Sequence, residues 1–82
     1  MEETLFETES EHPRGKIADY LEQVAENLRH GEVTLVSGGE EVTVEPPETA
    51  VFEVEVEHKE EDGEDEMSVE FEIEWKIDSD EK

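Results

Sequence analysis

The sequence predicts a two-layer α+β domain in which one amphipathic helix packs on the apolar face of a mostly antiparallel five-stranded sheet, in the order β-α-β-β-β-β. Apolar residues recur at spacings of three and four between residues 13 and 30, which indicates the helix. A Gly-Gly pair separates two short alternating segments, and residues 52 to 77 alternate apolar and acidic side chains on either side of a polar loop. With 82 residues the chain has room for one small core, so we expect a single domain over residues 1 to 82.

The first predicted elements are a short strand and the helix. Residues 4 to 9 alternate weakly and are expected to form the strand, with Phe6 facing inward. Pro13 suits the first position of a helix, because the N–H group that proline lacks would have no partner there. One apolar stripe then predicts a helix over residues 13 to 30, and its members are Ile17, Tyr20, Leu21, Val24 and Leu28. Gly31 supplies the left-handed residue that commonly ends a helix.

A tight hairpin is predicted next. Gly38 and Gly39 tolerate the positive φ of a two-residue turn, so they are expected to join strands over residues 33 to 36 and 41 to 44. Pairing about this turn places four apolar side chains on one face, Leu35 opposite Val42 and Val33 opposite Val44.

The last two strands carry the strongest pattern in the sequence. They are predicted over residues 52 to 57 and 67 to 77, joined by an acidic loop over residues 59 to 66 with Gly63 at its middle. A hairpin about this loop opposes apolar with apolar and acid with acid: Phe52 with Ile73, Val54 with Phe71, Val56 with Val69, Glu53 with Glu72 and Glu55 with Glu70. Two carboxylates about 5 Å apart in water repel by roughly 0.8 kcal/mol before screening, so this face favours salt. Residues 78 to 82 are expected to be a frayed tail.

The charge of the chain excludes several classes of partner. Asp and Glu number 28 against 6 Lys and Arg, which gives a formal net charge of −22. A phosphate backbone or an anionic lipid surface would meet its own sign here, so direct nucleic-acid binding and membrane docking are not expected. The screening length is about 8 Å at 0.15 M salt and about 3 Å at 1 M, so molar salt mutes repulsion between neighbouring carboxylates. The acid excess therefore indicates adaptation to a cytosol that holds molar salt. The alternative interpretation is an acidic tail or inhibitor from a mesophilic organism.

The cellular compartment is predicted from features that the sequence does not contain. It has no cysteine, which argues against a disulfide-stapled secreted protein. Its first residues are acidic where a signal peptide needs basic ones, and no apolar run reaches the roughly 18 residues of a membrane span. We therefore expect a cytoplasmic protein.

No motif in the sequence points to catalysis or to a cofactor. His12, His30 and His58 lack the i, i+4 spacing of a helical zinc pair. If Gly63 held the sixth position of a calcium loop, the first and twelfth positions would be His58 and Val69, where acids are required. No serine lies in a G-x-S-x-G context, so we expect no enzyme, no cofactor and no specific metal site. Weak, hydrated association of Mg²⁺ or Ca²⁺ is left open for four acids, Glu53, Glu55, Glu70 and Glu72.

Several segments together resemble the amphi-Trp domain family, small acidic proteins common in halophilic archaea. They are Leu5-Phe6-Glu7, Ile17-Ala18-Asp19-Tyr20-Leu21, Gly31-Glu32-Val33-Thr34-Leu35, Val42-Thr43-Val44-Glu45-Pro46-Pro47 and Val69-Glu70-Phe71-Glu72-Ile73-Glu74-Trp75. The resemblance covers essentially the whole chain. It implies a fold and a salty habitat, and it implies no chemistry.

The leading functional hypothesis is a non-enzymatic, salt-adapted interaction module. Its acidic sheet face or its Trp75 end would engage a protein partner or a second copy of the chain, since tryptophan is enriched at binding hot spots. The residues expected to take part are Trp75, Ile77, Glu53, Glu55, Glu57, Glu70, Glu72 and Glu74. Two alternatives are a cation-binding domain that uses the paired glutamates and an acidic mimic of nucleic acid that occupies a basic cleft.

Overall fold

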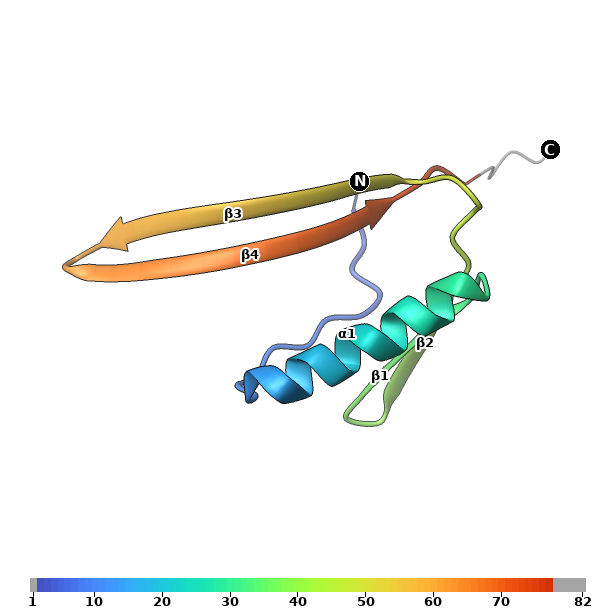
Figure 1. The fold of residues 1–82 in the computed structure, drawn as a ribbon, viewed down its shortest axis with the longest axis horizontal. Coiled ribbons are helices and arrows are strands. Elements are labelled where there is room, and N and C mark those ends of the chain that lie inside the picture. Colours follow the sequence, from blue (N-terminus) through green and yellow to red (C-terminus); the bar gives the residue numbers. More distant parts are fainter. Residues whose placement is uncertain (1, 78–82) are drawn as a thin grey trace. The chain divides into compact units, whose positions relative to one another are not determined.

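The computed structural model describes residues 2 to 77, and within them it has one helix and four strands. The strands form two separate antiparallel pairs, β1 with β2 and β3 with β4 (Figure 1). The α+β class and the antiparallel pairing are therefore confirmed, whereas a single five-stranded sheet is not. The chain divides into two compact units, Met1–Glu48 and Thr49–Lys82, which are described in turn.

The predicted first strand is absent from the described chain. Residues 4 to 9 form no ladder, although Phe6 is half-buried. The hydroxyl of Ser37 donates a hydrogen bond to the hydroxyl of Thr8 at 3.1 Å. This segment is therefore joined to β1 (Val33–Ser37) by a side-chain hydrogen bond instead of by backbone pairing. The expectation was wrong because the alternation supplies a single inward aromatic side chain, and so short a segment gains little from pairing.

The helix, α1 (Arg14–Arg29), lies within the predicted range at both ends. Pro13 is its N-cap in an extended conformation, and its carbonyl accepts hydrogen bonds from two N–H groups of the first turn. At the other end Gly31 has φ +81°. Its N–H group donates to the carbonyl of Leu28 at 3.0 Å, and that of Glu32 donates to Asn27 at 3.3 Å. These two bonds are the glycine-based motif that satisfies the last carbonyls of a helix.

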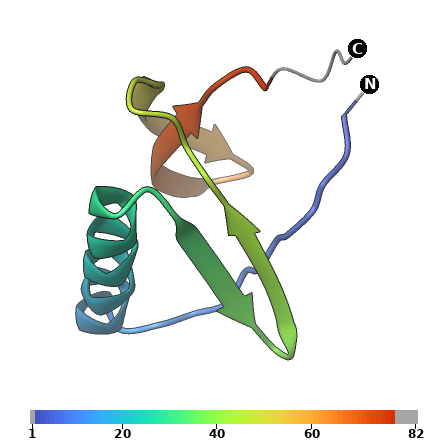
Figure 2. The same cartoon turned by 90° about the vertical axis from the view of Figure 1, so that its right-hand side faces the viewer.

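The first hairpin joins β1 (Val33–Ser37) to β2 (Glu40–Val44), and its register is the predicted one. Gly38 and Gly39 have φ of +55° and +88°, as a two-residue turn of this hand requires. Figure 2 shows α1 alongside this hairpin. The side-chain oxygen of Asn27 accepts a hydrogen bond from the N–H group of Thr34 at 3.3 Å, which ties the helix to β1.

The small core of the first unit lies at the C-terminal end of the helix. Val33 is 6% exposed and is the one buried hydrophobic residue within the described chain. Val24 and Leu28 are half-buried, whereas three members of the predicted apolar stripe nearer the start of α1 are exposed: Ile17, Tyr20 and Leu21. The stripe is therefore covered over only part of its length.

The strands of the second hairpin are longer than predicted, and the turn between them is shorter. β3 (Val51–Glu61) and β4 (Glu64–Glu74) are joined by Asp62 and Gly63 alone, with φ of +52° and +78°. The acidic loop expected over residues 59 to 66 is thus mostly strand. The prediction took polarity as a sign of a loop, but both faces of this end of the hairpin are exposed to solvent, and Asp-Gly strongly favours a two-residue turn.

The register of the second hairpin is confirmed at every predicted pair. However, β4 ends at Glu74, so Trp75 and Ile77 follow the strand instead of belonging to it. The tail expected over residues 78 to 82 lies outside the described residues. In the described part of the chain no helix is long and apolar enough to cross a membrane.

Candidate functional site

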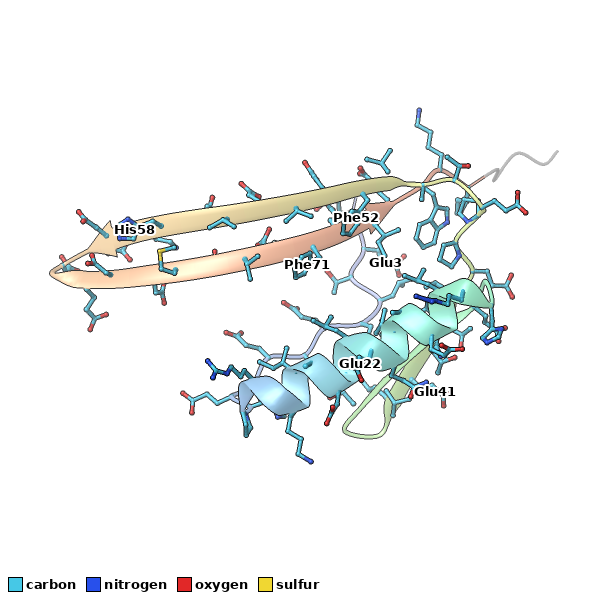
Figure 3. All side chains as sticks on the ribbon, in the orientation of Figure 1. Glu3, Glu22, Glu41, Phe52, His58 and Phe71 are labelled. Carbon is cyan, nitrogen blue, oxygen red and sulfur yellow. The ribbon has the colours of Figure 1, made fainter. Side chains whose placement is uncertain are left out.

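The first candidate site is one side of the β3–β4 hairpin, which we call the apolar face. The two-residue period places seven apolar side chains there: Phe52, Val54, Val56, Met67, Val69, Phe71 and Ile73. The rings of Phe52 and Phe71 are nearly parallel, with centroids 6.4 Å apart (Figure 3). Six of them are between 54% and 66% exposed, and Ile73 is half-buried. Among the described residues of its own unit, Thr49–Lys82, no further strand or helix covers this face.

The opposite side of the hairpin is the acidic ladder, which contains the six glutamates predicted as interaction residues: Glu53, Glu55, Glu57, Glu70, Glu72 and Glu74. Glu53 lies opposite Glu72, and Glu55 lies opposite Glu70. A hydrogen bond to the Glu53 carboxyl, followed by the negative charges of Glu53 and Glu74, raises the pKa of Glu72. The hairpin therefore brings together the four glutamates considered for Mg²⁺ or Ca²⁺.

The other two predicted interaction residues lie beyond the hairpin. Trp75 is half-buried and Ile77 is 76% exposed. Because β4 ends at Glu74, neither side chain is held in the ladder. The apolar face, which was predicted to be core, offers more accessible apolar surface than Trp75.

The three histidines have different neighbours. The His12 ring lies 2.7 Å from the Ser10 hydroxyl, and His30 Nε2 lies 3.1 Å from a carboxylate oxygen of Glu26 one helical turn earlier. The third, His58, has its Nε2 3.8 Å from Asp65 Oδ1. Glu60 completes this last group, in which one donor atom from each side chain lies within 4.8 Å of the others.

Sequence reasoning missed the His58 group because it tested helical spacing and assigned residues 59 to 66 to a loop. An Asp-Gly turn at residues 62 and 63 would have extended the alternation. It would then have placed His58, Glu60 and Asp65 on one side of the hairpin.

The first unit contains an open groove of about 530 Å³ between residues 8 to 12 and the start of α1. Its lining residues are Thr8, Glu9, Ser10, His12, Lys16, Ile17, Tyr20 and Leu21. Most of this lining is apolar by area, and the three stripe residues within it are those that α1 leaves exposed. A groove this open does not exclude water from a substrate.

Fold and surfaces together define a small, acidic α+β domain built around an amphipathic hairpin that is followed by a tryptophan. The sequence model of the Amphi-Trp domain family matches residues 1–82, and the chain belongs to that family. The resemblance drawn from the sequence is thus confirmed. No curated protein and no solved structure matches the chain.

Proposed function

We propose that this chain is a non-enzymatic, salt-adapted protein-interaction module of a salty cytosol, and that its partner is a second copy of itself bound through the apolar face. The observation that carries the proposal is the exposure of that face. Within the unit Thr49–Lys82, six apolar side chains on one side of one hairpin are each left more than half exposed. Contiguous apolar surface of this kind marks interaction sites in soluble proteins.

The hairpin itself needs a cover for this face. An isolated two-stranded hairpin is marginally stable in water, and stability comes from a third strand or from packing of an apolar face. The alternating parts of these strands, residues 52 to 57 and 67 to 74, gain their packing energy from one side only. A second copy supplies an identical apolar face of the same length.

The available area suits a reversible dimer. If each of the six side chains exposes on the order of 100 Å², the face offers roughly 600 Å² per copy. A standard interface buries about 800 Å² per partner, and weaker, transient ones fall below that. Hydrophobic association of this size is expected to be concentration-dependent.

Charge segregation permits the contact. The acidic ladder lies on the opposite side of the hairpin, so two apolar faces can meet while their ladders stay in water. Each copy still carries a formal net charge of −22, and the two repel at long range until salt screens them. Association is therefore expected to strengthen from dilute buffer to molar KCl.

Sedimentation equilibrium in molar KCl tests this proposal. The mass should rise from that of one chain to that of two as protein concentration increases. Phe71→Ser should weaken dimerisation by roughly tenfold or more, because it removes an aromatic ring from the centre of the proposed contact. Leu5→Ser is the matched control, since it removes a side chain of similar exposure from the other unit and should leave the mass unchanged.

Far-UV dichroism of both variants separates loss of contact from loss of fold. A folded Phe71→Ser monomer supports the proposal. A wild-type chain that stays monomeric at every concentration in molar KCl contradicts it, whatever the variants do, and so does equal weakening by Leu5→Ser.

A further inference from the structure

The turn end of the β3–β4 hairpin brings three potential metal ligands together from two strands. His58 (Figure 3) and Glu60 lie two residues apart on β3, so their side chains share one side of the hairpin. Asp65 on β4 is the cross-strand partner of Glu60 and lies on the same side. One donor atom from each residue lies within 4.8 Å of the others, and His58 Nε2 lies 3.8 Å from Asp65 Oδ1. Two carboxylates and one imidazole thus converge on one point.

We infer that His58, Glu60 and Asp65 form a binding site for a divalent transition metal, with Zn²⁺ as the favoured ion. Zinc takes one nitrogen and two carboxylate oxygens at about 2.0 to 2.2 Å, and tetrahedral geometry places such ligand atoms about 3.4 Å apart. The His58–Asp65 separation is close to that value already. From the 4.8 Å limit the donor atoms would have to close by up to about 1.4 Å through rotation of exposed side chains, and water would fill the fourth position.

The backbone beneath the site is fixed. Asp62 and Gly63 form a two-residue turn with both φ values positive, which sets the register of the strands on either side. The ligands therefore come from paired strands next to a tight turn, a more defined platform than the loop expected there. Only side-chain rotation is needed for the three donors to meet.

The imidazole of His58 distinguishes this site from the many surface carboxylates of the chain. Carboxylates in water bind Mg²⁺ and Ca²⁺ weakly and retain most of the ions' hydration, and the chain has 28 acids that can do so. A histidine nitrogen favours zinc and its neighbours in the transition series over those hard cations. Zinc should therefore bind here in the presence of excess Mg²⁺.

The other two histidines provide an internal comparison. His30 has one carboxylate beside it, from Glu26, and His12 has a hydroxyl. Among residues 2 to 77, the His58 group is the one in which three such donors converge. Only His58 is accordingly expected to contribute to tight zinc binding.

Titration of Zn²⁺ into the full chain, in molar KCl with excess Mg²⁺, tests the inference. Calorimetry should give a saturable isotherm with one equivalent of zinc. In the same titration, ¹H–¹⁵N spectra should show the largest shifts at His58, Glu60, Asp65 and the facing Met67.

Two variants make the outcome decisive. His58→Ala should weaken zinc binding by roughly tenfold or more, since it removes the one nitrogen donor of the three. His30→Ala removes another exposed histidine beside a carboxylate and should leave the isotherm unchanged. The inference is overturned if the wild-type chain shows no saturable heat under Mg²⁺, or if the two variants weaken binding equally.

The zinc site does not require the proposed dimer, although its ligands lie on the same side of the hairpin as the apolar face. Its ligands lie at the turn end of one hairpin, and one copy supplies all three. Sedimentation with and without Zn²⁺ distinguishes the two claims: a monomer that binds one zinc supports the site alone, and a dimer without saturable zinc binding supports the dimer alone.

Discussion

Glu72 is the residue at which the acidic ladder acts most directly on stability. Its pKa is raised by the hydrogen bond and charge of Glu53, and the charges of Glu74 and Glu70 act in the same direction. A carboxyl whose folded pKa exceeds its unfolded value stabilises the fold fully below the unfolded pKa, and that contribution is lost as the pH rises through the folded one. At neutral pH the ladder is therefore under repulsion that protonation or salt relieves.

Glu72→Gln should raise the midpoint of thermal unfolding at neutral pH in dilute salt, because an amide opposite Glu53 removes one of two opposed charges. The increase should shrink in molar KCl and also as the pH falls through the raised pKa. Dichroism-monitored melts measure both trends. Glu57→Gln is the control, since Glu57 faces Ser68 rather than an acid. Equal gains from the two substitutions would contradict the ladder explanation.

Substitution of alanine for the two glycines at the ends of α1 should change the free energy of unfolding in opposite directions. Gly31 has φ +81° with open space around it, so Gly31→Ala adds strain without a clash and should lower the free energy of unfolding by about 1 kcal/mol. Gly15 lies inside the helix, also in open space, and Gly15→Ala should raise it by up to about 1 kcal/mol. Urea unfolding in molar KCl measures both. Loss of stability in Gly15→Ala would contradict the placement of Gly15 inside the helix.

At the scale of the element, β3 and β4 are longer, and the turn between them is shorter, than the polarity of residues 59 to 66 suggests. Cross-strand pairing at Lys59–Glu66 and Glu60–Asp65 should produce nuclear Overhauser contacts between these residues. Strand-like chemical shifts should continue up to Glu61 and resume at Glu64. Random-coil shifts over residues 59 to 66 would instead favour the loop, and would also remove the basis of the zinc site.

Much of each element followed from local chemistry in the sequence. Both hairpin registers were predictable because a glycine-containing turn and a two-residue period leave one pairing that keeps apolar side chains together. The helix was predictable from its stripe and from Gly31. Residues 4 to 9 were not, because whether a weak strand forms depends on an available sheet edge elsewhere in the chain. The His58 group was missed for a related reason, since it depends on pairing across a turn.

At the scale of the whole molecule, charge dominates. The excess of acids is spread over the chain and concentrated on the ladder, so the fold is expected to depend on screening. Far-UV dichroism should show substantial loss of structure as KCl falls from molar to millimolar, at constant pH and protein concentration. An equal concentration of an uncharged osmolyte controls for general solvent effects. Full retention of structure in dilute buffer would contradict the salt requirement.

The central claim is that the apolar face of the β3–β4 hairpin meets the same face of a second copy. An isotope-filtered nuclear Overhauser experiment in molar KCl, on an equal mixture of ¹³C-labelled and unlabelled chains, tests it most directly. The account predicts intermolecular contacts from the rings of Phe52 and Phe71 to methyl groups of Val54, Val56 and Val69. The absence of any contact between labelled and unlabelled chains, at concentrations well above the proposed dimerisation range, would contradict it.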